Sequence, residues 1–136
     1  MTICFEIKGE PAAKGRPRMT KSGHAYTPAK TRNYEDYVRW FYIQQVRNAD
    51  IIIDKPVGVS MIFRFAVRKS YGKKTLEELK KHKMARPIKP DIDNLAKSVL
   101  DALNGLAYQD DKLITHLEVS KIYSENPGTT VCIYEI

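Results

Sequence analysis

The residues best suited to chemistry lie between positions 91 and 111. Neighbouring carboxylates raise one another's pKa unless a cation compensates, so a cluster of aspartates in a basic protein needs an explanation. Magnesium prefers hard oxygen ligands and is often held by a few carboxylates together with substrate phosphates. Such an ion can generate hydroxide and stabilise the charge that develops on a phosphodiester, while a nearby ammonium neutralises another phosphate oxygen. Five aspartates and one lysine fall within these twenty-one residues: Asp91, Asp93, Lys97, Asp101, Asp110 and Asp111.

The spacing of these residues predicts how they are grouped. Asp91 and Asp93 are two positions apart at the end of an extended segment, so their side chains can point to the same side. Asp93, Lys97 and Asp101 are spaced four apart, which places them on one face of a helix. The pair 110–111 precedes a predicted strand, and we expect a loop to bring one of its two carboxylates across to the first pair.

The same residues also have a purely structural interpretation. Asp91 or Asp93 can cap the following helix, since a carboxylate accepts hydrogen bonds from exposed backbone N–H groups. Lys97 and Asp101 can form a surface ion pair, and the pair 110–111 can belong to a turn. The residues alone leave both interpretations open.

Charge is distributed unevenly along the chain, whose formal net charge is +7 and whose pI is near 9.4. Positions 14–32 hold six basic residues and no acid, and positions 68–89 hold nine basic residues and two acids. From Asp91 onward, eight acids face three bases. Basic surface suits a polyanionic partner, because lysine and arginine that neutralise phosphates release condensed counterions. The alternative is that the lysine runs are only solvated faces.

The elements that must position these residues follow from hydrophobic periodicity and from turn residues. Val57, Val59, Met61, Phe63 and Phe65 alternate, which predicts a central strand. The first half of the chain is predicted to contain a strand over 2–8, a long loop over 9–28, a helix over 29–49 and the central strand over 57–67.

In the second half of the chain, a buried stripe of Leu95, Val99 and Leu103 predicts a helix that starts at Asp91 or Asp93. Asn104-Gly105 is a fitting stop for this helix. The full prediction is a short basic helix over 75–83, an extended segment over 86–90, this helix, a strand over 113–123, a turn over 125–128 and a strand over 129–136 as its hairpin partner. We therefore expect one α+β domain over 1–136, with helices packed on a mixed sheet.

Several functional classes are excluded by composition. The N-terminus has neither a basic region nor a long apolar region, and no apolar run reaches membrane-spanning length, so we expect a cytoplasmic protein with no membrane partner. Cys4 and Cys132 lie in strand-like patterns near opposite ends of the chain, and we expect both to be reduced core residues. The three histidines share no zinc-ligand spacing.

Several short motifs resemble one known family. They are Lys-Pro-Asp-Ile-Asp-Asn-Leu-Ala-Lys at 89–97, Leu-Asp-Ala-Leu-Asn-Gly at 100–105 and Asp-Asp-Lys at 110–112. Lys-Gly-Arg-Pro-Arg at 14–18 and Tyr-Thr-Pro-Ala-Lys at 26–30 are similar to the opening of phage members of the same family. Together these motifs resemble the RusA family of Holliday junction resolvases.

The resemblance implies a RusA-like fold and a homodimeric, magnesium-dependent endonuclease, in which Mn²⁺ can substitute for Mg²⁺. Such an enzyme resolves four-way junctions by symmetric paired nicks in DNA recombination and repair. By position, Asp91, Asp93 and Asp111 match the essential metal-binding acids, Lys97 matches the essential lysine, and Asp110 matches an accessory acid at the metal. Asp101 lies within the family pattern, but we do not assign it a catalytic role.

In this interpretation the two basic blocks hold the junction arms by their phosphates, which recognises shape more than sequence. Two other functions remain open: a different structure-selective metal-dependent nuclease acting on forks or flaps, and a non-catalytic nucleic-acid-binding protein. The candidate DNA-binding residues are Lys14, Arg16, Arg18, Lys21, Lys30, Arg32, Lys73, Lys74, Arg86 and Lys89.

Overall fold

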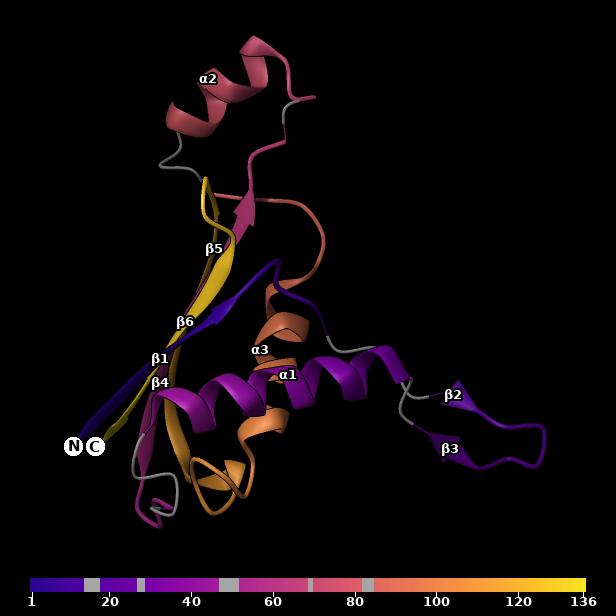
Figure 1. The fold of residues 1–136 in the computed structure, drawn as a ribbon, viewed down its shortest axis with the longest axis vertical. Coiled ribbons are helices and arrows are strands. Elements are labelled where there is room, and N and C mark those ends of the chain that lie inside the picture. Colours follow the sequence, from indigo (N-terminus) through magenta and orange to yellow (C-terminus); the bar gives the residue numbers. More distant parts are fainter. Residues whose placement is uncertain (14–17, 27–28, 47–51, 69, 82–84) are drawn as a thin grey trace.

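The computed structural model of the chain describes residues 1–136 except 14–17, 27–28, 47–51, 69 and 82–84 (Figure 1). It is an α+β domain with a mixed sheet, as predicted. In chain order the elements are β1 (Thr2–Lys8), β2 (Arg18–Met19), β3 (Ala25–Tyr26), α1 (Ala29–Gln45), β4 (Val57–Ala66), α2 (Lys73–Lys81), α3 (Ile92–Leu103), a 3-10 turn η1 (Asp111–Leu113), β5 (Ile114–Ser124) and β6 (Gly128–Glu135).

The main sheet has the strand order β1-β6-β4-β5, with β4 parallel to β5 and antiparallel to β6. The prediction that β4 is central is confirmed, but the prediction that β5 and β6 form a hairpin is wrong. β6 lies on the other side of β4 and pairs with β1. The physical reason is burial, because β4 is buried at most positions and needs a neighbour on each side, whereas β5 is exposed at many positions and suits the sheet edge.

The core lies between this sheet and the helices α1 and α3, which cover one face (Figure 1). Alternate residues of β4 point to this face, and the apolar stripe of α3 packs on them. The two termini lie together at the end of the sheet opposite α2 (Figure 1), where Glu135 N donates to Met1 O at 3.2 Å. In the described part of the chain, no helix is long and apolar enough to cross a membrane.

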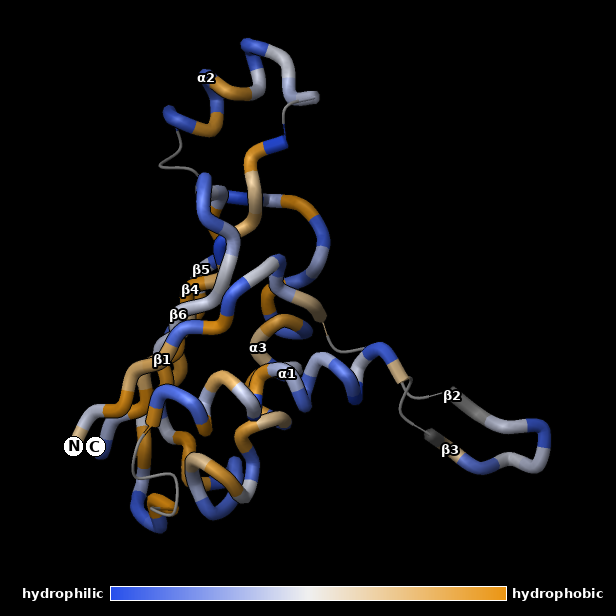
Figure 2. The backbone as a smooth tube through the Cα atoms, in the orientation of Figure 1, coloured by the Kyte–Doolittle hydropathy of each residue, from blue (hydrophilic) through white to orange (hydrophobic). Residues whose placement is uncertain are grey.

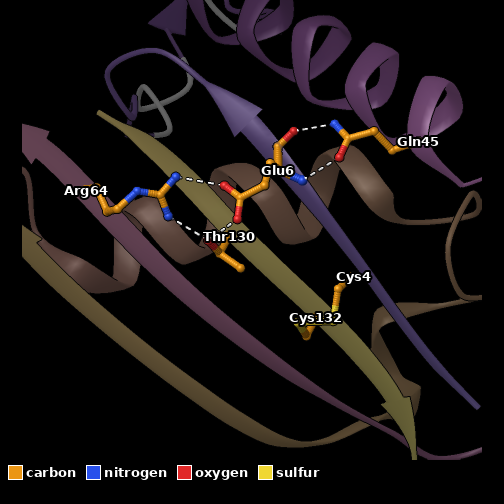
Figure 3. Close-up of a disulfide and its surroundings, with 6 residues drawn as sticks. All are labelled: Cys4, Glu6, Gln45, Arg64, Thr130 and Cys132. Atoms are coloured by element: carbon orange, nitrogen blue, oxygen red, sulfur yellow. Dashed lines mark hydrogen bonds and ion pairs between the residues drawn. A yellow bond between two sulfur atoms is a disulfide. The ribbon is translucent and has the colours of Figure 1, made fainter. Parts of the chain in front are cut away.

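The expectation that Cys4 and Cys132 are reduced core residues is wrong. β1 and β6 pair in a register that sets these two cysteines directly opposite each other, and a disulfide joins them (Figure 3). Because Phe5 and Ile7 face the core, Cys4 and Glu6 must face the opposite side of the sheet. There Glu6 binds Arg64 at 2.7 Å, and its backbone exchanges hydrogen bonds with the Gln45 side chain.

The segment predicted as a loop over 9–28 contains the small antiparallel sheet β2–β3. Its strands are two residues long, too short for an alternating pattern to be visible in the sequence. The hairpin extends away from the main sheet beyond α1, and Figure 2 shows that its described residues are mostly hydrophilic. The helix predicted over 29–49 ends at Gln45, and positions 47–51 lie outside the described residues.

Candidate functional site

Helix α3 carries two of the predicted site residues, Asp93 and Lys97, and a third, Asp91, directly precedes it. Its amphipathic pattern buries Leu95 and Val99 completely, which leaves Asp93 and Lys97 exposed on the other face. Asp93 lies in the first turn, where a negative charge opposes the helix dipole favourably. The helix ends as predicted, with Asn104 at the C-cap and Gly105 in the left-handed region at φ +77°. The sequence pattern thus sets both the length of α3 and the face on which its charges lie.

Asp91 is the N-cap residue of α3, but its side chain makes no capping hydrogen bond. Its backbone is extended, and its carbonyl accepts the first helical hydrogen bond, from Leu95 N at 3.1 Å. A carboxylate at this position usually accepts from the N–H groups of the first turn. Asp91 thus occupies the N-cap position, but its side chain does not cap the helix. Its exposed carboxylate is available for another role.

The pair 110–111 divides into two different roles. Asp110 is the N-cap of η1, and its Oδ1 accepts from Lys112 N at 3.0 Å. The carboxylate of Asp111 is exposed, while its backbone N–H donates to Asn104 Oδ1 at 3.1 Å. The structural interpretation as a turn thus describes Asp110 well. Asp111 is instead held against the C-terminal end of α3 with its carboxylate in solvent.

The two aspartates of this pair influence each other's ionisation. A hydrogen bond shared with Asp110, together with the negative charges of Asp110 and Asp101, raises the pKa of Asp111. The backbone N–H of Lys112 and the same shared hydrogen bond lower the pKa of Asp110. Burial, and then the charges of Asp111 and Asp101, raise the pKa of Tyr108, whose hydroxyl donates to Leu100 O at 2.6 Å. Negative charge therefore accumulates at this end of α3.

The structure does not bring Asp91 and Asp93 to the pair 110–111. Asp91 directly precedes α3, whereas Asp111 is hydrogen-bonded to Asn104 at the C-terminal end of α3. A helix of 12 residues is about 18 Å long, so the two groups of acids are separated by roughly that length. Figure 1 shows the chain entering α3 from the side of α2 and leaving it toward the opposite end of the molecule. Among the residues that the structure describes, no three acidic, histidine or cysteine side chains are grouped closely enough to hold a metal ion.

The carboxylates nevertheless fit magnesium by donor chemistry. They are hard oxygen donors, and the unused N-cap carboxylate of Asp91 lies two residues from that of Asp93. At the other end of α3, the carboxylates of Asp110 and Asp111 are adjacent and the negative charge of Asp110 helps to raise the pKa of Asp111, an effect that a bound cation would offset. Each end of α3 thus offers an incomplete set of ligands.

The predicted DNA-binding residues lie in several elements. Lys21 is exposed between β2 and β3, Lys30 and Arg32 are exposed near the start of α1, and Lys73 and Lys74 begin α2. Lys89 is exposed in the segment before α3. Lys14 and Arg16 lie outside the described residues, and Arg18 belongs to β2.

Arg86 differs from the other candidates, because its side chain is engaged within the protein. The guanidinium lies over the Phe65 ring at 4.0 Å and near the Tyr123 ring at 5.7 Å. Its Nη1 also donates to Lys89 O at 2.6 Å. The geometry therefore argues against a role for Arg86 in holding a phosphate. Sequence reasoning missed this because the partners lie on β4 and β5, far from position 86.

Comparison with known proteins places this architecture in a family. A family model described as "Endodeoxyribonuclease RusA" matches residues 8–134. The chain is also similar to the "Uncharacterized protein YqaN" of Bacillus subtilis (strain 168), with 38% identity over 139 residues, covering 98% of this chain and 96% of that protein. The family match includes α3, both ends of its acidic region and both basic blocks. This chain belongs to the RusA family of endodeoxyribonucleases.

Proposed function

We propose that this endodeoxyribonuclease resolves four-way DNA junctions by paired, magnesium-dependent nicks. The observation that carries the proposal is the family match over nearly the whole chain. The carboxylate of Asp91 supports it, because an aspartate that served only as a helix cap would accept from the N–H groups of the first turn, and this one does not. Lys97 is exposed on the following helix, where a phosphate can reach it. The assigned residues are Asp91, Asp93 and Asp111 as metal ligands, Lys97 as the phosphate-neutralising cation and Asp110 as an accessory acid.

We further propose that two copies of the chain complete each site, and the separation along α3 supports this. Asp91 and Asp93 lie at one end of the helix and Asp111 at the other, about 18 Å apart along its axis. A two-fold axis that runs perpendicular to α3 and beside its middle makes the two α3 helices antiparallel. The N-terminal end of α3 in one chain then lies near the C-terminal end of α3 in its partner. A homodimer built in this way has two equivalent sites, which suits two symmetric nicks in a nearly two-fold junction.

The chain's own residues have distinct tasks in this chemistry. Bound magnesium supplies the Lewis acid that stabilises negative charge on the phosphodiester. Asp91 and Asp93, at the start of α3, and Asp111, fixed by Asn104, provide the carboxylates that hold the ion. Lys97 lies one helical turn after Asp93 on the same face, from which its ammonium neutralises a phosphate oxygen.

The starts of α1 and α2 support binding to a polyanion. Each helix has no acid in its first turn, and basic residues lie at both starts, Lys30 in α1 and Lys73 in α2. Cations at a helix N-terminus oppose the helix dipole, so this placement is unfavourable unless an anion binds there. DNA phosphates supply such an anion. The β2–β3 hairpin extends away from the main sheet (Figure 2), and Lys21 lies exposed between its two strands, so we expect this hairpin to contact a junction arm.

Substitution of the two separated acids tests this assignment. We expect Asp91→Asn and Asp111→Asn each to abolish junction cleavage, and to preserve or tighten junction binding because each removes charge that repels phosphate. Asp36→Asn makes the same chemical change on an exposed residue of α1 and should cleave like the wild type. Cleavage and binding are measured on the same labelled junction. Retained cleavage in either site variant would remove the assignment of that residue.

A further inference from the structure

The segment that leads into Asp91 is held by two cationic side chains. Lys121 Nζ donates to Ile88 O at 2.6 Å and to Pro90 O at 2.9 Å. Arg86 Nη1 donates to Lys89 O at 2.6 Å. Three successive carbonyl oxygens, the last of them directly before Asp91, thus accept hydrogen bonds from positively charged donors. Such hydrogen bonds are stronger than those from neutral donors.

The sequence of this segment explains why it needs such donors. It begins beside β5, where Ala85 pairs with Ile122 and Arg86 N donates to Lys121 O at 3.2 Å. Pro87 and Pro90 have no N–H, so the segment cannot continue as a regular strand on this edge of the sheet. Its carbonyl groups then bond to side chains or to water instead of to a neighbouring strand. Lys121 reaches them from the strand that the segment has just left.

We propose that Lys121 is a positioning residue for the metal-binding carboxylates at the start of α3. By binding the carbonyls of Ile88 and Pro90, it fixes the backbone on which Asp91 is placed and from which the first turn carrying Asp93 begins. Lys121 touches neither DNA nor metal in this role, and it acts through the backbone before Asp91. The inference rests on the proposed function, since it assigns Lys121 a part in that same site.

Two other roles for Lys121 make different predictions. As a phosphate ligand it would need its ammonium in solvent, but the side chain is half-buried and donates to two carbonyls. As a purely structural contact it would resemble Arg64. That residue lies on the opposite side of the sheet and joins Glu6 at 2.7 Å, Thr130 at 2.6 Å and Asn126 O at 3.2 Å (Figure 3). Arg64 is therefore a matched control.

The test compares Lys121→Met, which keeps the chain length but removes charge and donors, with Lys121→Arg and Arg64→Met. Thermal unfolding first ranks the stability of the full-length variants. Mn²⁺ affinity is then measured by electron paramagnetic resonance without DNA. The single-turnover rate of junction cleavage is measured against Mg²⁺ concentration, and junction affinity is measured in Ca²⁺ over a series of salt concentrations.

We expect Lys121→Met to weaken Mn²⁺ binding and slow cleavage by roughly 10–100-fold, as loss of an outer contact does at metal sites. Its cleavage should need more Mg²⁺, its salt dependence should not change, and Lys121→Arg should recover most of the loss. Arg64→Met should lose stability but keep wild-type metal affinity. Wild-type metal affinity in Lys121→Met, an equal loss in Arg64→Met, or a smaller salt slope would each overturn the proposal. A wild type that binds Mn²⁺ but cuts no junction would instead reject the proposed function alone.

Discussion

The side-chain oxygen of Asn104 accepts a hydrogen bond from the backbone N–H of Asp111 at 3.1 Å. This contact joins the C-cap of α3 to the residue that we assign as the third metal-binding acid. The helix and the turn η1 are otherwise connected by residues 104–110, which contain Gly105 at positive φ. The side chain of Asn104 therefore holds the backbone of Asp111 close to the C-terminal end of α3.

Replacing Asn104 with alanine should affect both stability and cleavage. Asn104→Ala leaves the N–H of Asp111 without this acceptor, which should cost about 1 kcal/mol in the free energy of unfolding. Cleavage should fall roughly 10-fold, because the supporting contact of a metal ligand is lost. Asn126→Ala, in the exposed turn before β6, is the control. Unfolding in urea and single-turnover cleavage measure the two effects, and an unchanged cleavage rate would show that this contact does not position Asp111.

The pair 110–111 predicts a specific pH dependence. The shared hydrogen bond and the charge of Asp110 raise the pKa of Asp111, so Asp111 keeps its proton to a higher pH than an ordinary aspartate. Metal binding requires the ionised form, so metal affinity and cleavage should fall as pH decreases through this raised pKa. Asp110→Asn removes the charge, lowers the pKa of Asp111, and should move the acid limb of the cleavage profile to lower pH.

The comparison is a pH series of single-turnover rates at subsaturating Mg²⁺. Asparagine also accepts hydrogen bonds at an N-cap, so Asp110→Asn should keep the contact with Lys112 N and the fold of η1. An acid limb that stays in place would mean that Asp110 does not control the ionisation of Asp111. Complete loss of cleavage at every pH would mean that Asp110 is itself an essential ligand.

Mixed dimers test whether two chains share each site. In a dimer of Asp91→Asn with Asp111→Asn, shared sites place both defects in one site and leave the other intact. Such a dimer should nick one strand, although each variant alone is inactive. Two affinity tags isolate the mixed dimer, and a plasmid with a cruciform reports the product as nicked circles instead of linear DNA. Mixed dimers as inactive as their parents would show that both acids serve the same site from one chain.

Salt dependence separates the lysines that we expect to contact phosphate from Arg86, whose side chain is engaged within the protein. Loss of one phosphate contact lowers the slope of log affinity against log salt by about 0.9. We expect this change for Lys73→Met and for Lys74→Met, both exposed at the start of α2. Arg86→Met should leave the slope unchanged and lower the melting temperature, because the guanidinium loses its contact with the Phe65 ring. The reverse pattern would restore Arg86 as a DNA-binding residue.

Local patterns explain what could be predicted from the sequence. The alternation of Val57 to Phe65 identifies a buried strand, and the stripe of Leu95 and Val99 with the stop at Asn104 sets the bounds of α3. Each of these signals depends on neighbours within about one or two turns or a few strand positions. The family motifs suggest which acids to assign to the metal site, but they carry no information on how those acids are arranged in space.

Long-range geometry explains what could not be predicted. The strand order depends on which neighbours β4 needs, and the disulfide depends on the register that sets Cys4 opposite Cys132. The separation of Asp91 from Asp111 did have a signal in the sequence. A helix that occupies most of the interval between them must hold its ends apart by its own length, about 1.5 Å for each residue. The prediction of one acid cluster is wrong because residue types alone do not include this length.

Cleavage of a synthetic four-way junction tests the central claim most directly. The wild-type protein is incubated with the junction, with a fork and with a duplex of matched sequence, in Mg²⁺ and in chelator, and the cut positions are mapped on every strand. We predict symmetric nicks in two opposed strands of the junction, in Mg²⁺ only, and no cuts in the duplex. Tight binding to the junction without cleavage in Mg²⁺ would contradict the account, and equal cutting of the fork would replace it with a broader structure-selective nuclease.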